Sequence, residues 1–251
     1  MREPRRTQIT MAVNREEFIT FEQLMALFPE ISEMTLRTDL RDLDREGKIV
    51  RVHGGAKSIE TVVRSDDLFF KKATRNMENK KQIARKAVSF LTTTGLMFLD
   101  CGTTMMEFAR VFPDDKYHVI TYSISSIIEL ARLSNPQVIM LGGRLNRFNL
   151  STIDSRNRLD LEKMNFEVAF IAVSGYSKEQ GFTCGMETDD ELRYAAIRKA
   201  KKVVMLMDSS KVNRVFPITY ATLEDIDVLI SDDGLDAETA AYMRSKGVEV
   251  Y

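Results

Sequence analysis

The 251-residue chain lacks most features that mark secreted, membrane-bound or metal-dependent proteins. Its apolar runs are far shorter than the roughly 20 residues that cross a bilayer, and its charged N-terminus has no apolar core segment. Its only two cysteines, Cys101 and Cys184, have no metal-ligand spacing, and neither a GxGxxG nor a Walker loop occurs. We therefore expect a cytoplasmic protein with reduced thiols, no membrane partner, no metal and no cofactor.

The chain also lacks a strong net charge, because it carries a formal charge of only −1 at pH 7. The charge is unevenly distributed, however. Residues 57–86 hold nine Lys and Arg against four Asp and Glu, whereas residues 87–251 hold 18 against 23. The basic stretch either adds attraction for phosphates or forms a solvated linker helix, and we favour the linker.

The clearest feature that the chain does have is a predicted helix between Ser32 and Gly47 with a polar outer face. Ser32 is a good N-cap, and Gly47 is typical of a helix end. Leu36, Leu40 and Leu43 share one stripe at helical spacing. The side facing away from the leucines carries Met34, Thr35, Thr38, Arg41 and Arg45, with Arg37 at its edge. Such a helix can lie in a DNA major groove, where arginines reach phosphates or guanine edges.

The flanking segments extend this pattern to a winged helix-turn-helix. A first helix is predicted over residues 5–17, and a short second helix begins after Thr20, which has capping-box spacing to Gln23. Pro29 ends that second helix at Phe28. A ribbon that turns at Gly54-Gly55 follows the third helix, which completes the motif. The alternative is a small helical subdomain whose charged face is merely solvated.

Residues 31–56 resemble the signature of the DeoR family of bacterial transcriptional regulators, whose recognition helix reads Ser-x-x-Thr-x-Arg-x-Asp-Leu and whose wing reads Arg-x-His-Gly-Gly-Ala. The matching residues are Ser32, Thr35, Arg37, Asp39, Leu40, Gly47, Arg51, His53, Gly54, Gly55 and Ala56. Thr38 stands where a second Arg is usual, and the turn before Ser32 is one residue longer than usual. The resemblance implies DNA contacts from Ser32, Thr35, Arg37, Thr38, Arg41, Arg51, His53 and Gly54.

From about residue 80 the pattern changes to short apolar strands that alternate with helices. Strands are predicted over residues 96–100, 118–121, 137–141, 168–173, 203–207, 227–230 and 248–250. Helices are predicted over residues 80–91, 105–112, 124–133, 187–200 and 237–245. This alternation favours a mainly parallel sheet covered on both faces. We therefore predict a DNA-binding domain over residues 1–58, a linker over 59–79 and an α/β domain over 80–251.

Ligands bind to such sheets where strands end and helices begin. Asp100-Cys101-Gly102-Thr103-Thr104 lies at one such junction, and Lys211 follows another strand. Gly102 permits close backbone approach, and the helix that follows offers free N–H groups, which together favour phosphate. The alternative is an ordinary turn with a capped helix, which we favour for this segment taken alone. Gly142-Gly143 is either a further part of the site or a plain turn.

The residues at these strand ends also resemble the sensor domain of the DeoR family. That domain is similar in fold to ribose-5-phosphate isomerase and coenzyme A transferases. The resemblance implies a phosphorylated sugar or related effector, held by Asp100, Gly102, Thr103, Thr104, Gly142, Gly143, Glu187 and Lys211. It also covers Gly181, Phe182, Thr183 and Asp208. Tyr122, Asp154 and Tyr176-Ser177 depart from the usual residues around the expected pocket. These departures indicate an unusual effector or weakened effector binding.

Taken together, these observations predict a regulator of a carbohydrate-metabolism operon. The resemblance implies a repressor, because members of the family usually repress. Its expected partners are operator DNA, a phosphorylated metabolite and further copies of itself, because one short recognition helix contacts too few bases. The alternative is a sugar-phosphate isomerase-like enzyme with an added N-terminal domain. That alternative is disfavoured because an isomerase-like Asp is missing at Tyr176-Ser177 and the chain has only two histidines, His53 and His118.

Overall fold

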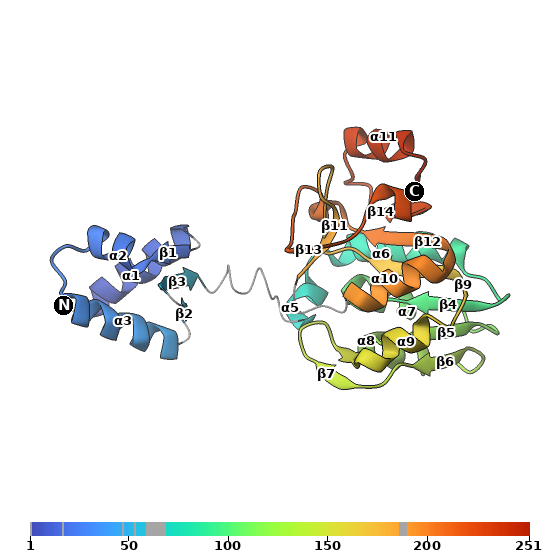
Figure 1. The fold of residues 1–251 in the computed structure, drawn as a ribbon, viewed down its shortest axis with the longest axis horizontal. Helices are drawn as coiled ribbons and strands as arrows, with labels where there is room; N and C mark the ends of the chain where they lie inside the picture. The colour runs from blue at the N-terminus through green and yellow to red at the C-terminus, as the bar shows by residue number, and fades with distance from the viewer. Residues whose placement is uncertain (1, 17, 47, 53, 59–68, 186–189) are drawn as a thin grey trace. The chain divides into compact units, whose positions relative to one another are not determined.

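The computed structural model describes residues 2–16, 18–46, 48–52, 54–58, 69–185 and 190–251. The chain divides into two compact units, residues 1–67 and residues 68–251, and each is described separately (Figure 1). Some predictions from the sequence lie outside the described residues. They are the helix end at Gly47, the DNA contact of His53, the effector contact of Glu187, the start of the helix predicted over 187–200 and the first ten residues of the predicted linker.

The first unit combines three helices with a small antiparallel sheet. The helices are α1 (Arg2–Glu16), α2 (Phe21–Leu27) and α3 (Glu33–Arg45). The strands are β1 (Phe18–Thr20), β2 (Ile49–Val52) and β3 (Gly55–Ser58), in the order β1-β3-β2. The three predicted helices and the ribbon are confirmed, whereas β1 was not predicted. Strand β1 is only three residues long, and it exists because it pairs with the remote β3.

Local signals set the helix boundaries in this unit. Thr20 and Gln23 form the predicted capping box, and the Ser32 hydroxyl accepts a hydrogen bond from the Thr35 N–H. The apolar stripe of α3 is confirmed, because its three leucines are almost completely buried. They join one core with residues of the other elements, namely Ile9, Val13, Ile19, Leu24, Ile31 and Ile49. Burial of these side chains is the main source of helix stability, since short helices are marginal in water.

The second unit is built on a seven-stranded parallel sheet. Its strands are β4 (Leu96–Leu99), β5 (His118–Thr121), β6 (Gln137–Met140), β9 (Phe166–Ala172), β12 (Ala200–Met207), β14 (Val228–Ser231) and β15 (Glu249–Val250). Their order is β15-β14-β12-β9-β4-β5-β6, and every pairing in this sheet is parallel. The predicted α/β fold with a mainly parallel sheet is confirmed.

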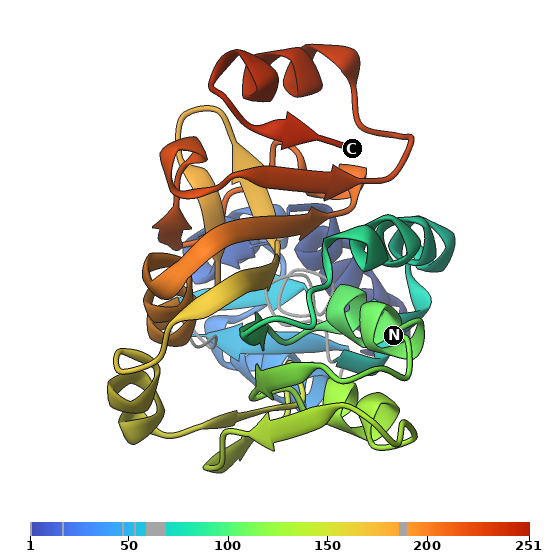
Figure 2. The same cartoon turned by 90° about the vertical axis from the view of Figure 1, so that its right-hand side faces the viewer.

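Helices cover both faces of this sheet, which explains why its central strands are mostly apolar, with charged residues only near the starts of β9 and β12. On one face lie α6 (Met77–Ala87), α7 (Thr103–Arg110) and α8 (Ile124–Leu130), whereas α9 (Ser155–Leu161) and α10 (Asp190–Lys199) lie on the other (Figure 2). Each face has its own buried core, one including Phe108 and Phe170 and the other including Phe98 and Phe166. Helix α11 (Ala237–Ser245) leads to the edge strand β15.

Several short elements of the second unit were not predicted. They are the hairpin of β7 (Arg144–Asn146) and β8 (Ser151–Ile153), helix α9, and an antiparallel sheet of β10 (Gly175–Ser177), β11 (Gly181–Cys184) and β13 (Ile218–Ala221). Helix α5 (Phe69–Thr74) and the start of α6 fall within the predicted linker but belong to the second unit. None of the described helices is both long and apolar enough to cross a membrane.

Candidate DNA-binding face and effector site

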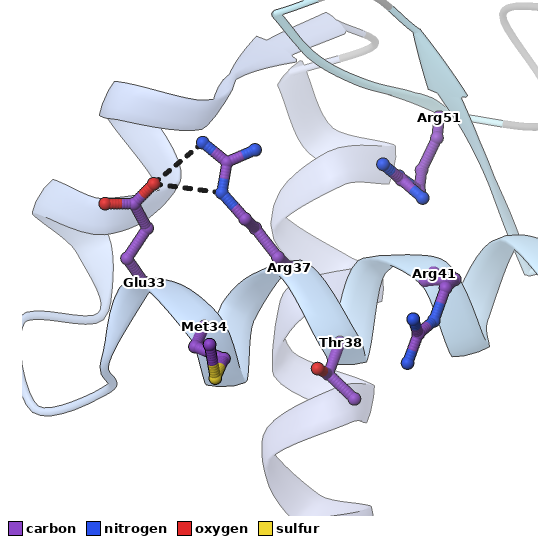
Figure 3. A pocket seen from close by; sticks show the side chains of 6 residues that line it. All are labelled: Glu33, Met34, Arg37, Thr38, Arg41 and Arg51. Atoms are coloured by element: carbon purple, nitrogen blue, oxygen red, sulfur yellow. Dashed lines mark hydrogen bonds and ion pairs between the residues drawn. The ribbon is translucent and has the colours of Figure 1, made fainter.

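The exposed face of α3 and strand β2 together form an open pocket of about 490 Å³ in the first unit. Its lining residues come from α3, apart from one that comes from β2. They are Glu33, Met34, Arg37, Thr38, Arg41 and Arg51 (Figure 3). Four of the eight predicted DNA-contact residues therefore meet around one surface. The concentration of guanidinium groups suits an anionic ligand.

Arg37 is positioned by two neighbours. Its Nε and Nη2 both donate to Glu33 Oε1, at 2.9 and 2.7 Å, and its guanidinium lies 4.4 Å from the centre of the Phe21 ring. Both charged side chains are about 60% exposed, so this i,i+4 ion pair contributes only about 0.3–0.5 kcal/mol. A phosphate or a guanine edge can displace Glu33 at little cost. The sequence prediction overlooked Glu33, although its spacing to Arg37 is the usual signal for such a pair.

Arg41 and Arg51 are both exposed, and within the described residues neither has a carboxylate partner. The backbone N–H of Arg51 donates to the Asp44 carboxylate at 3.0 Å, which fixes the start of the wing on the end of α3. Gly54 turns the ribbon with φ of +82°, a conformation that favours glycine. The wing is thereby held beside the same pocket as the helix.

Ser32 and Asp39 have structural roles in this unit. Ser32 caps α3, and its hydroxyl also lies 2.9 Å from that of Thr35. Asp39 is almost completely buried and pairs with Arg5 of α1, with 2.7 Å between Oδ2 and Nε. The Asp of the Arg-x-Asp-Leu pattern therefore ties α3 to α1 and faces the interior. DNA contact by Ser32 and Thr35 stays a prediction.

In the second unit, the carboxyl ends of the parallel strands bring several predicted residues to one edge of the sheet. Asp100 follows β4, Tyr122 follows β5, and Asp208 follows β12. Between β4 and α7, Gly102 adopts φ of +113° and serves as the N-cap residue. The first helical hydrogen bond runs from Met106 N–H to Gly102 O. The N–H groups of residues 103–105 therefore have no acceptor within their own helix, which is the geometry that favours anions.

Asp100 lies at the centre of a buried polar cluster. Its carboxylate accepts hydrogen bonds from Arg193 Nε at 2.8 Å, from the Ala172 N–H at 3.0 Å and from the Tyr122 hydroxyl. Burial, followed by the charge of Asp100, raises the pKa of Tyr122 well above its ordinary value, so this phenol stays protonated. Tyr122, noted as a departure from the family pattern, thus donates to Asp100. Three donors from the protein already bind the carboxylate that we expected to accept bonds from a sugar.

Arg193 of α10 was not predicted to be part of the site. Its side chain is only 4% exposed, and its Nη1 has no hydrogen-bond partner among the described residues. The guanidinium carbon lies 5.4 Å from the centre of the Tyr220 ring, and Nη2 lies 3.7 Å from Cys101 Sγ. A buried cation with an unused donor beside a helix N-terminus is suited to an anionic ligand. Its remote pairing with Asp100 left no signal in the sequence.

Lys211 and the glycine pair lie on other loops at the carboxyl ends of strands. Lys211 Nζ lies 3.5 Å from Asp208 Oδ2. Burial favours protonation of Asp208, but the charge of Lys211 and hydrogen bonds from Ser210 and Asn76 outweigh burial and lower the pKa of Asp208. Gly143 has φ of +138°, and an added Cβ would lie 2.5 Å from Ile153 O, so glycine is required by the fold there. Gly142 has open space.

Two further departures from the family pattern have local structural explanations. Asp154 is the N-cap of α9, accepts the Arg156 N–H at 2.9 Å and forms an ion pair with the Arg156 side chain. Ser177 accepts the Gln180 N–H at 3.0 Å and closes the turn between β10 and β11. Burial raises the pKa of Tyr176 to about 12, and its hydroxyl has no hydrogen-bond partner among the described residues.

Comparison with known proteins finds two family matches in the chain. Residues 5–62 match the DeoR-like helix-turn-helix domain, and residues 75–233 match the DeoR C-terminal sensor domain. The HTH-type transcriptional regulator GlpR of Haloferax volcanii is 36% identical over 87% of this chain and 86% of that protein. The lactose phosphotransferase system repressor of Streptococcus mutans is 27% identical over 92% of each. Ribose 5-phosphate isomerase A from Neisseria gonorrhoeae aligns over 53% of this chain and 52% of that chain, with 18% identity and a TM-score of 0.38.

Proposed function

This chain belongs to the DeoR family of transcriptional regulators, and on that premise we propose that it is a cytoplasmic repressor of a carbohydrate-metabolism operon. It binds operator DNA as a homo-oligomer, and a phosphorylated sugar or related metabolite controls its affinity for the operator. The observation that carries this proposal is the arginine-lined face of α3 and β2. The names of two relatives, a transcriptional regulator and a lactose-system repressor, support the class of target.

The first unit presents its polar helix face in the way that major-groove readers do. Arg37 and Arg41 extend from α3, and Arg51 extends from the adjacent wing strand (Figure 3). Arginine binds guanine edges and phosphates in bidentate fashion, whereas Thr38 supplies a smaller hydroxyl contact. We therefore assign base reading to α3 and phosphate contact to the wing. Specificity further requires two copies on two half-sites about 34–36 Å apart.

In the second unit, we place the phosphate of the effector at the turn that contains Gly102, Thr103 and Thr104. The N–H groups of the first turn of α7 lack helical acceptors, and the helix dipole favours negative charge there. Arg193 is the cation next to this turn, because its Nε and Nη2 approach Asp100 and Cys101. Lys211 at the end of β12 is a second candidate cation.

We also propose that the second unit senses its ligand without converting it. Proton transfer at a sugar carbon needs a carboxylate that is free to accept the proton. Asp100 has no exposed surface, and three protein donors bind its carboxylate. An aldose–ketose interconversion assay with pentose and hexose phosphates is expected to show no turnover above the buffer rate. Turnover abolished by Asp100→Asn would instead support an enzyme.

The variant Thr103→Leu tests the placement of the effector. A leucine at the second residue of the turn blocks a phosphate and changes no residue of the first unit. The parent should be stabilised by at least one member of a panel of pentose and hexose phosphates, by about 2.7 kcal/mol at 100 times its Kd. Thr103→Leu should lose this stabilisation and still bind operator, and Thr93→Leu, at an exposed threonine, should behave as the parent. The placement is wrong if Thr103→Leu responds at the parent's ligand concentration, or if the unphosphorylated sugars work equally well.

A further inference from the structure

The seven-stranded sheet ends in two edge strands that differ in their protection. Strand β15 is two residues long and carries the charged Glu249. Strand β6 is four residues long, reads Gln-Val-Ile-Met and has no charge, and no other strand in the described part of the chain pairs with its outer side. Native proteins protect sheet edges with charges, bulges, proline or a covering element. Within β6 none of the first three is present.

Two of the three exposed side chains of β6 are apolar, and the third is the uncharged Gln137. Ile139 is 54% exposed and Met140 is 39% exposed, although both lie in a regular strand of the main sheet. Ile128, on the neighbouring helix α8, is 56% exposed. Exposed apolar groups that adjoin an unprotected strand edge mark an association surface.

The backbone of β6 is arranged for pairing with a copy of itself. The N–H groups of Gln137 and Leu141 donate inward to Tyr117 O and Thr121 O, at 2.8 and 2.9 Å. Because strand peptides alternate in direction, the N–H and C=O groups of Val138 and Met140 point outward. In an antiparallel pair centred on Ile139, Val138 of each copy faces Met140 of the other, which satisfies four outward hydrogen bonds. A register centred on Val138 would place Met140 opposite Pro136, which has no N–H to donate.

We propose that β6 is the interface between two copies of this chain, which pair antiparallel across a two-fold axis at Ile139 and join two seven-stranded sheets into one. This inference rests on the proposed function, because an operator-binding regulator needs a second copy. It adds the surface through which the two copies bind each other. A two-fold axis requires a self-complementary surface, and a strand centred on one residue meets that requirement. The two Ile139 side chains then form a directly opposed cross-strand pair.

Two substitutions test the interface by different physical routes. Met140→Pro removes an outward N–H and leaves the inward hydrogen bonds of β6 in place, so the second unit should stay folded. Ile139→Lys places two like charges opposite each other across the axis. Val215→Lys is the matched control, because Val215 is 57% exposed but lies outside β6. Light scattering should show a dimer for the parent and the control, and a monomer for both β6 variants, with unchanged circular dichroism.

A cross-link gives a positive readout. Residues at 139 form a non-hydrogen-bonded pair with Cα atoms about 4.5 Å apart, which is within disulfide range. Ile139→Cys should give a covalent dimer under mild oxidation on a non-reducing gel, and Val215→Cys should not. A monomeric parent, a dimer that persists in both β6 variants, or no cross-link at 139 would each overturn the interface. The oligomeric state is read without DNA, so specific operator binding by a protein whose dimer uses another surface would leave the proposed function standing.

Discussion

Asp100 and Arg193 form a fully buried ion pair, with 2.8 Å between Oδ2 and Nε, that joins the carboxyl end of β4 to helix α10. The two residues are 93 positions apart in the chain, so only the folded sheet brings them together. The Tyr122 hydroxyl and the Ala172 N–H complete the shell of the carboxylate. The pair therefore organises the strand ends at which we place the effector.

Removing the cation of this pair should destabilise the second unit strongly. Arg193→Ala leaves the carboxylate of Asp100 buried without its counter-charge, and such a loss costs about 3–5 kcal/mol. The measurement is urea unfolding of the full chain followed by circular dichroism. The control Arg198→Ala changes an exposed arginine on the same helix and should lie within about 0.5 kcal/mol of the parent. A loss of less than about 1 kcal/mol in unfolding free energy for Arg193→Ala would show that the ion pair contributes little to stability.

The glycine pair between β6 and β7 separates a structural role from a ligand-binding one. Gly143→Ala puts a Cβ 2.5 Å from Ile153 O on a backbone with φ of +138°, and we expect a loss of about 1–3 kcal/mol in unfolding free energy. Gly142→Ala meets open space and should be nearly neutral. Thermal unfolding of the two variants side by side checks this. Equal effects on stability would contradict the structural assignment of Gly143.

Lys80 gives the second unit a defined pH dependence. Its ammonium donates to Arg75 O at 2.7 Å and to Lys72 O, and burial lowers the pKa of Lys80 from 10.5 to about 8. Between about pH 8 and 10.5 the unfolded chain binds more protons at this group than the folded chain does, so its contribution to stability rises with pH. The Tm of the parent relative to Lys80→Met should therefore increase from pH 8 to pH 10. A constant or falling difference would contradict the pKa assignment.

Local signals made part of this structure predictable from the sequence. The start of α3 depends on Ser32 and on nearby leucines, and the capping box of α2 lies within four residues, so both could be read without tertiary information. Strand β5 was predicted with its observed limits, and its short buried run from Val119 to Thr121 fits a parallel strand that is covered on both faces. The seven-stranded parallel sheet followed from the alternation of such strands with helices.

Elements that depend on remote partners could not be predicted in this way. Strand β1 forms only because it pairs with β3, and its three residues carry no periodic pattern. Arg193 looks like any charged residue of an amphipathic helix until Asp100 is placed beside it. The same holds for Asp39, which belongs to a recognised DNA-binding pattern but turns inward to Arg5. The sequence pattern therefore indicates the segments that form each site, but it does not tell which of their side chains are exposed and which are buried.

The most direct test of the regulator is operator binding by variants of the arginine face. Fluorescence anisotropy at fixed salt, on the duplex upstream of the protein's own gene and on a scrambled duplex, compares the parent with Arg37→Ala, Arg41→Ala and the exposed control Arg156→Ala. We predict that the parent and the control prefer the upstream duplex. Each α3 variant should lose about 1–3 kcal/mol of binding free energy if its arginine reads a guanine. Unchanged affinity in both α3 variants, or equal binding of the two duplexes by the parent, would contradict sequence-specific recognition by α3.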